Sequence, residues 1–269
     1  MKLTSSKSTA LRYRYVLENF LYRHRDKPLP EQYGRWDIVD FKEMRLREGI
    51  NPATVNLELS ILRAFWNWLI ERELASVNPA SRQKYLTVPE KRPRGLGREA
   101  IEKLLSVCYS VRDKLIILLP LTTGMRGVEM ARLQWSDIDW ENNLIHLDGE
   151  RTKTKGSRTL PLRADVKELL LRFKDERRKN VFPCHRGQGD PRTLQLHFNR
   201  IVKRAELNPR PTLHALRHTF ATMLLRTGLD IYSVQKLMGH TQLKTTTRYL
   251  APADSTTVRE AVDSFPTLA

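Results

Sequence analysis

A segment rich in proline and glycine, Leu86–Gly97, divides the sequence of 269 residues into two parts. Its letters after the leucine, TVPEKRPRGLG, show no apolar periodicity and include the basic residues Lys91, Arg92 and Arg94. Proline and glycine interrupt helices and strands, and a polar segment has no apolar face to bury. The pattern therefore predicts two domains and a linker. The predicted parts are a first domain at 1–88, a linker at 89–97, and a second domain at 98–269 with a C-terminal tail at 251–269.

The first part has the apolar spacing of a small helical bundle. The spacing predicts helices over Ser5–Arg23 and Asp37–Glu48. A third helix is predicted after Asn51, which can cap it, with Pro52 at its first position. Proline is tolerated there because its missing N–H would have no partner inside the helix. The residues expected on the apolar side of the first helix are Leu11, Tyr15, Leu17, Phe20 and Leu21.

The second part is also mostly helical but contains one strand-like stretch. Leu144–Leu147 and Arg158–Leu162 flank a basic loop, Glu150–Ser157, which predicts a β-hairpin with a lysine-rich tip. The fold class expected is therefore mainly α: a small helical bundle followed by a mixed α+β domain with a small β-sheet or hairpin. The first helix expected in the second part follows Gly97 and ends at Val107. Four more are expected at Arg112–Leu121, Thr193–Ala205, His214–Arg226 and Ile231–Met238.

The charge points to a polyanionic partner. The chain contains 47 Lys and Arg against 30 Asp and Glu, a net charge of +17. Nucleic acid is the commonest polyanion, although a merely basic surface is the alternative.

No run approaches the ~18 apolar residues of a membrane-spanning helix, and the N-terminus lacks the apolar core of a secretory signal. Cys108 and Cys184 form no CxxC pair and are expected to be reduced thiols in the cytoplasm.

The first group of candidate functional residues is TGMRGVE, which ends at Glu129. Gly124 and Gly127 allow a tight turn that places Arg126 at the start of the next helix, where the helix dipole favours an anion. Glu129 lies three residues further on the same side and could orient Arg126. The alternative is an ordinary surface pair of arginine and glutamate.

The second group is HALRH, in which His214 and Arg217 are three residues apart and reach one side of a helix. A zinc protease would need HExxH, and this sequence has no glutamate there. Zinc stays an alternative without a third ligand at convincing spacing, so no metal site is expected.

Two further groups complete the set. In LMGHTQLKTTTRYL, Gly239 ends a helix and His240 follows it, with Tyr249 nine residues later. The basic hairpin tip, RTKTKGSR, either clamps phosphates or delivers one lysine into an active site. These groups include no P-loop and no carboxylate pair suited to two metal ions. They suit transesterification of a phosphodiester without metal or ATP. In such a reaction guanidiniums neutralise the transition state, a phenol attacks phosphorus and a cationic acid protonates the leaving oxygen.

In this order, arginine, lysine, HxxR, GH and tyrosine, the motifs resemble the tyrosine recombinase (phage integrase, Xer-like) family over nearly the whole chain. The resemblance implies site-specific DNA recombination, in integration, excision or resolution, through a 3′-phosphotyrosyl intermediate. It also implies that the first part is a helical core-binding, SAM-like, DNA-binding domain. The expected assembly is a homo-tetramer on double-stranded DNA that passes through a Holliday junction. No cofactor is expected, and accessory DNA-bending proteins are optional partners.

The resemblance assigns roles residue by residue. Arg126 and Arg217 match the catalytic arginines, and Glu129 the acidic residue that supports the first of them. Lys153 matches the hairpin lysine, with Lys155 as its rival because hairpin register is hard to fix from sequence. The remaining catalytic matches are His214 for proton transfer or phosphate binding, His240 on the scissile phosphate and Tyr249 as the nucleophile. DNA contacts are expected from Lys91, Arg92, Arg94, Lys155 and Arg158.

Two other functions stay open at this stage. A type IB topoisomerase uses nearly the same residues to nick and rejoin DNA, and a non-catalytic DNA-binding protein would share the charge. The sequence does not separate a phage integrase from a Xer-type, transposon or plasmid recombinase. It also does not decide whether the tail docks on its own domain or on a neighbouring protomer.

Overall fold

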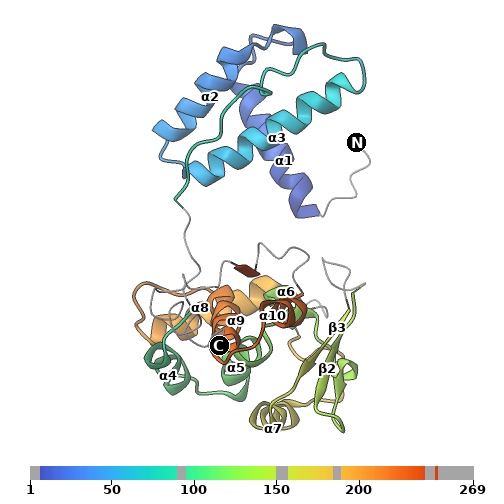
Figure 1. The fold of residues 1–269 in the computed structure, drawn as a ribbon, viewed down its shortest axis with the longest axis vertical. Helices are drawn as coiled ribbons and strands as arrows, with labels where there is room; N and C mark the ends of the chain where they lie inside the picture. Colours follow the sequence, from blue (N-terminus) through green and yellow to red (C-terminus); the bar gives the residue numbers. More distant parts are fainter. Residues whose placement is uncertain (1–6, 90–94, 150–156, 184–188, 240–245, 248–269) are drawn as a thin grey trace, which may run out of the picture. The chain divides into compact units, whose positions relative to one another are not determined.

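A computed structural model describes residues 7–89, 95–149, 157–183, 189–239 and 246–247 of the chain, and Figure 1 shows its helices and strands. Contacts divide the chain into two compact units, Met1–Lys91 and Arg92–Ala269. The domain boundaries drawn from the sequence stay a prediction. No helix in the described residues is long and apolar enough to cross a membrane.

The first unit is built from three α-helices and one turn of 3-10 helix. These are α1 (Lys7–Arg23), η1 (Pro30–Gln32), α2 (Arg35–Arg47) and α3 (Pro52–Ile70). The predicted cap of α3 is confirmed, since the Asn51 side chain accepts a hydrogen bond of 2.9 Å from the Ala53 N–H. Both α1 and α2 pack against α3. Phe20 lies at the centre, with its ring centroid 5.3 Å from that of Phe41 and 5.5 Å from that of Trp66.

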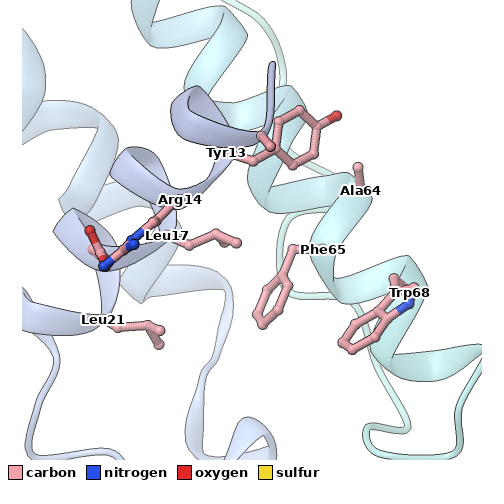
Figure 2. Close-up of a pocket in the computed structure, with 9 residues that line it drawn as sticks. Tyr13, Arg14, Leu17, Leu21, Ala64, Phe65 and Trp68 are labelled. Carbon is pink, nitrogen blue, oxygen red and sulfur yellow. The ribbon is translucent and has the colours of Figure 1, made fainter. Parts of the chain in front are cut away.

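The predicted core face of α1 is partly wrong. Leu11 and Tyr15 are 65% and 57% exposed, whereas Val16, which the spacing did not single out, is buried beside Phe20. The reason is that α1 carries apolar residues on several sides, so the pattern does not identify the one that faces α3. Two other predicted core residues, Leu17 and Leu21, line a cavity of about 370 Å³ between α1 and α3. Figure 2 shows its walls, including Tyr13, Leu17, Leu21, Phe65 and Trp68.

A buried ion pair joins α2 to α3. The Arg45 guanidinium donates two hydrogen bonds, of 2.8 and 2.6 Å, to the Glu58 carboxylate, and both side chains are buried. Arg45 also donates to Glu48 at 2.5 Å, and Glu48 in turn accepts from Arg23 of α1 at 2.6 Å. Charged hydrogen bonds thus connect all three helices of this unit.

The second unit is organised around α5 (Val111–Thr123), whose residues Leu115–Leu119 are buried. Helices α7 (Ala164–Phe173), α8 (Pro191–Arg204) and α9 (Leu213–Arg226) pack against it. The remaining helices are α4 (Arg98–Ser106), α6 (Gly127–Arg132), η2 (Trp135–Asp137) and α10 (Ile231–Met238).

A small antiparallel sheet completes the second unit, in the order β1-β2-β3. Its strands are β1 (Ile138–Asp139), β2 (Leu144–Leu147) and β3 (Arg158–Pro161). The predicted hairpin is confirmed, with Leu144 opposite Pro161 and Leu147 opposite Arg158. In Figure 1 the sheet stands to one side of the unit, and α10 lies between it and α9. The sequence analysis did not predict β1 or α7.

The chain is anchored just before the predicted linker and again near the linker's C-terminal end. Leu86 exchanges two hydrogen bonds with the Asn56 side chain of α3, at 2.7 and 2.9 Å. In the second unit, the Leu96 N–H donates to the Thr219 hydroxyl of α9 at 2.7 Å. Gly95 lies against the same residue, since a Cβ there would be 3.1 Å from the Thr219 Cα. The chain therefore enters the second unit two residues along α9 from Arg217.

Candidate active site

The predicted functional residues in the described part of the second unit gather where α5 and α10 end, α6 and α9 begin, and β3 passes (Figure 1). Gly124 ends α5 in the left-handed conformation, with φ of +66°. Phe220 of α9 lies so close that a Cβ on Gly124 would be 2.4 Å from its ring. The glycine therefore permits both the turn before Arg126 and the close approach of α9.

Arg126 and Glu129 form a reciprocal pair at the start of α6. Glu129 accepts from the backbone N–H of Arg126 at 2.8 Å, which caps the helix, and from its Nη1 at 2.8 Å. The other terminal nitrogen, Nη2, donates to the Gly239 carbonyl at 2.7 Å. Glu129 therefore contacts the Arg126 side chain while completing the helix end.

Arg217 lies inside the protein rather than on its surface. Its side chain is almost fully buried, and its two terminal nitrogens donate to the carbonyls of Gly124 and Met238. It thereby ties the end of α5 to the end of α10. A buried guanidinium is costly unless hydrogen bonds compensate it, and here backbone carbonyls accept from its two terminal nitrogens.

Arg158 also lies in this interior, which corrects an expectation. The sequence assigned it to the DNA phosphates, but in the structure its guanidinium is paired with the carboxylate of Glu129 inside the protein. Two nitrogens donate to the Glu129 carboxylate at 2.6 and 3.1 Å, and Nε donates to the Leu237 carbonyl at 2.9 Å. We call Arg126, Arg158, Arg217 and Glu129 the arginine cluster.

The arginine cluster caps the C-terminal end of α10. The carbonyls of Leu237, Met238 and Gly239 accept from Arg158, Arg217 and Arg126 respectively. The last carbonyls of a helix lack partners within it and carry partial negative charge, so cations there are favourable. Three consecutive carbonyls thus hold three guanidiniums side by side.

Charge at the arginine cluster shifts two pKa values. Burial alone would raise the pKa of Glu129, but hydrogen bonds and charge from Arg158 and Arg126 outweigh it and hold that pKa below its ordinary value. His214 lies in the first turn of α9 and is partly exposed. The protein atoms around its ring remove part of its hydration, and this desolvation, together with the charges of Arg217 and Arg126, lowers the pKa of His214. Its imidazole is therefore neutral at pH 7.

The neighbour of the His214 ring is a second histidine one turn along α9. The ring centroids of His214 and His218 are 4.5 Å apart, at an interplanar angle of 76°. This edge-to-face contact places the two imidazole rings next to each other on one side of α9. In the part of the chain that the structure describes, no group of three or more His, Cys, Asp or Glu side chains could hold a metal ion.

Two family models match this chain. One, the phage integrase family, matches residues 95–256, and the other, the phage integrase N-terminal SAM-like domain, matches residues 3–73. The chain belongs to the phage integrase family. The first match covers every residue of the arginine cluster, and the second covers α1, α2 and α3.

Curated relatives of this phage integrase-family member are named tyrosine recombinases. XerD of Listeria innocua is 30% identical over 236 residues, which cover 82% of this chain and 78% of the relative. XerA of Saccharolobus solfataricus is 33% identical over 242 residues, which cover 86% of this chain and 77% of the relative. The chain is thus a tyrosine-type site-specific recombinase.

Solved structures share the recombinase's fold at lower identity. The Tn1549 transposon integrase, in complex with a circular intermediate DNA, aligns with a TM-score of 0.81 and 21% identity over 98% of this chain and 96% of that one. A lambda integrase tetramer bound to a Holliday junction aligns with a TM-score of 0.76 and 20% identity over 94% of this chain and 74% of that one.

The structure brings together four of the catalytic and supporting residues expected in this tyrosine recombinase: Arg126, Glu129, His214 and Arg217. Sequence reasoning missed the part played by Arg158 and by the end of α10, because both depend on contacts between segments far apart in the chain. The other expected site residues lie outside the described residues, as does the tail at 251–269. They are Lys91, Arg92, Arg94, Lys153, Lys155, His240 and Tyr249.

Proposed function

We propose that this tyrosine recombinase cleaves and rejoins double-stranded DNA at a specific site, with Tyr249 as the nucleophile. The observation that carries the proposal is the pairing of Arg126 and Arg217. They come from segments 91 residues apart, yet both donate to neighbouring carbonyls at the end of α10. Two guanidiniums fixed side by side suit the two non-bridging oxygens of one phosphate.

The cleavage step exchanges one phosphodiester for another. The phenol oxygen of Tyr249 attacks phosphorus and loses its proton to a base, for which His214 is our candidate. A bond forms between this oxygen and the phosphorus on the DNA 3′ end, and the bond from phosphorus to the 5′ oxygen breaks. Lys153, or Lys155 in its place, gives the leaving 5′ oxygen a proton, and His240 binds the phosphate. Because one ester replaces another, rejoining by the reverse step needs no ATP.

The neutral state of His214 supports its role. A histidine can accept a proton from Tyr249 only while it is neutral, and the lowered pKa keeps it so at pH 7. The charges that lower this pKa, on Arg217 and Arg126, would also favour the loss of the phenol proton if Tyr249 attacks the same phosphate.

We propose that Arg126 and Arg217 act mainly in the transition state. In the ground state a phosphodiester carries one negative charge, and the charge on its oxygens grows as the fifth bond to phosphorus forms. Fixed donors stabilise that added charge without reorganising, and losing one of them typically costs 10²–10³-fold in rate. The contacts with Glu129 and the carbonyls at the end of α10 supply that fixed geometry for these two arginines.

The expected assembly is a homo-tetramer on DNA in the cytoplasm, with accessory DNA-bending proteins as optional partners. The proposed DNA contacts are the first domain at 1–88 and the linker cations Lys91, Arg92 and Arg94. The net charge of +17 supports this proposal. The tail at 251–269 is proposed to dock on a neighbouring protomer, which would couple cleavage at one tyrosine to its neighbour.

The test is covalent capture followed by mutation. The protein is incubated with fragmented genomic DNA, denatured with detergent, and the DNA that stays attached is sequenced at its junction. A duplex of that sequence, nicked next to the cleavage site, then serves as a suicide substrate. Wild-type protein should accumulate an adduct on this duplex, whereas Tyr249→Phe should bind it and form none. An adduct of undiminished yield with Tyr249→Phe would refute the assignment.

The same DNA separates recombinase from topoisomerase. A type IB topoisomerase would relax a supercoiled plasmid of any sequence, whereas the proposed recombinase should act only on one that contains the captured site. Efficient relaxation of a plasmid without the site would favour the topoisomerase function.

A further inference from the structure

The geometry points to Arg158 as a positioning residue for DNA cleavage: it fastens β3 to Glu129 and to the end of α10, and so holds Arg126 and the carbonyls at that helix end in place. This inference rests on the proposed function. It replaces the phosphate contact that the sequence suggested for Arg158 with a role inside the protein.

The hydrogen bonds of Arg158 fit this role. Its guanidinium places Nη1 and Nη2 on the two oxygens of Glu129, at 3.1 and 2.6 Å, and Nε on the Leu237 carbonyl at 2.9 Å. These three nitrogens lie in one rigid plane, so the distance between the carboxylate and the helix end is set by the side chain itself. Lysine, with one nitrogen, cannot span both partners in this way.

Glu129 passes this constraint on to Arg126. Each Glu129 oxygen carries one Arg158 nitrogen and one group of Arg126: Oε1 accepts from Nη1 and Oε2 from the backbone N–H, both at 2.8 Å. Rotation of the carboxylate would break contacts on both sides. Arg158 therefore fixes the angle at which Glu129 presents the Arg126 guanidinium.

The second constraint acts on the end of α10. Arg158 holds the Leu237 carbonyl, one residue before the carbonyl that Arg217 holds and two before the one that Arg126 holds. Gly239 shows how tight this contact is, because a Cβ there would be 2.8 Å from Nη1 of Arg158. In the sequence, Gly239 directly precedes His240.

The place of Arg158 in the chain adds a third consequence. Lys153 lies five residues before Arg158, in the segment that leads directly into β3. Fixing Arg158 to Glu129 therefore also fixes the strand from which that lysine segment departs. One side chain thus connects the start of β3, the start of α6 and the end of α10.

The experiment compares cleavage and binding in single variants of the full chain. Arg158→Gln removes the charge and the planar fork, and Arg158→Lys keeps only the charge. The matched control is Arg163→Gln, which removes one positive charge from an exposed arginine that pairs with Asp165 at the start of α7. Each protein is mixed in excess with the nicked duplex, and the rate of adduct formation, the Kd and the slope of log K against log salt are measured.

We expect Arg158→Gln to slow adduct formation by about 100-fold, the scale of one lost transition-state donor. Its salt slope should equal that of wild type, because no phosphate contact is lost. The rate of adduct formation in Arg158→Lys should lie between those of Arg158→Gln and wild type. Arg163→Gln should cleave at the wild-type rate. A slope reduced by about 0.9 in Arg158→Gln would instead show that Arg158 binds a phosphate and would overturn the inference. A wild-type cleavage rate in Arg158→Gln would overturn it equally.

A pH profile separates positioning from general loss of structure. The carboxylate of Glu129 faces Arg126 from α6 and Arg158 from β3, and removal of Arg158 lets its pKa rise. Protonation of His214 slows cleavage in both proteins at acid pH. In Arg158→Gln a second loss of rate, from protonation of Glu129, should appear at higher pH than in wild type. A reduced rate with an unshifted profile would indicate only a structural defect and would count against the role.

Two controls keep the result interpretable. If thermal unfolding shows that Arg158→Gln does not fold, Arg158→Lys decides, because it keeps the charge but cannot span Glu129 and the Leu237 carbonyl together: slow cleavage with an unchanged salt slope supports positioning, and a wild-type rate overturns it. The inference and the proposed function also fail differently. Without any Tyr249-dependent adduct in the wild type the proposed function fails, whereas an intact wild-type reaction that Arg158→Gln leaves unchanged removes only the role of Arg158.

Discussion

The ion pair between Arg45 and Glu58 provides a quantitative test of how the first unit holds together. Replacing Glu58 with leucine leaves the Arg45 guanidinium buried, with the partly exposed Glu48 as its remaining acidic contact. Breaking a buried pair from one side typically costs 3–5 kcal/mol. Glu48 compensates part of the charge, so we expect the free energy of unfolding to fall by about 3 kcal/mol.

Replacing both partners should have a much smaller effect. Arg45→Met with Glu58→Leu leaves no unpaired charge between α2 and α3, and apolar replacements of a buried pair are often neutral or stabilising. Both new residues also favour helices. The double variant is therefore expected to be at least as stable as wild type, which makes the coupling between the two sites larger than either single effect.

Hydrogen exchange of the α3 amides measures this locally in the full chain, where unfolding of the second unit does not interfere. A loss of about 3 kcal/mol predicts exchange about 100-fold faster in Glu58→Leu, and wild-type rates are predicted for the double variant. Equal acceleration in the single and the double variant would refute the reasoning. It would show that the side chains matter for their shape or hydrogen bonds rather than for the unpaired charge.

Other predictions concern the second unit. Arg217→Lys should slow adduct formation by about 10²–10³-fold at nearly unchanged DNA affinity, because lysine cannot reach the carbonyls of Gly124 and Met238 together. Gly124→Ala should cost about 3 kcal/mol in urea unfolding, from the left-handed backbone and the contact with Phe220, whereas Gly228→Ala, also left-handed but with open space around it, should cost about 1 kcal/mol. Wild-type protein should lose stability as the pH falls below about 6.5, since the unfolded chain binds a proton at His214 more readily than the folded one, and His214→Gln should lose less. EDTA should leave the rate of adduct formation unchanged, and a strict Mg²⁺ requirement for bond breaking would contradict the proposed chemistry.

Local signals explain which elements could be predicted. Helix α10 has the predicted bounds because Asp230 caps its start and Gly239 ends it in the left-handed conformation. By contrast, α7 was missed: Arg163 stands at its start and makes no side-chain cap, so the usual start signal is absent. Strand β1 is two residues long and too short for any periodicity.

The candidate site was predictable in its residue types but not in its internal contacts. Spacing placed Arg126 with Glu129 and His214 with Arg217, because each pair lies on one helix end. Whether an arginine lies on the surface or inside depends on what approaches from elsewhere in the chain. Arg158 meets Glu129 across 29 residues and α10 across 79, and neither encounter leaves a local signal.

The arginine cluster has a consequence for folding itself. It contains three guanidiniums and one carboxylate, so positive charge exceeds negative by two. Neutral carbonyls accept hydrogen bonds but cancel no charge, and like charges held close in a partly dehydrated interior repel one another. An anion that binds there relieves this repulsion only in the folded chain, so mass action shifts the equilibrium toward the native state. The substrate phosphate would then act as a folding ligand, and a recombinase seated on DNA would withstand heat or proteolysis better than the same chain searching for its site.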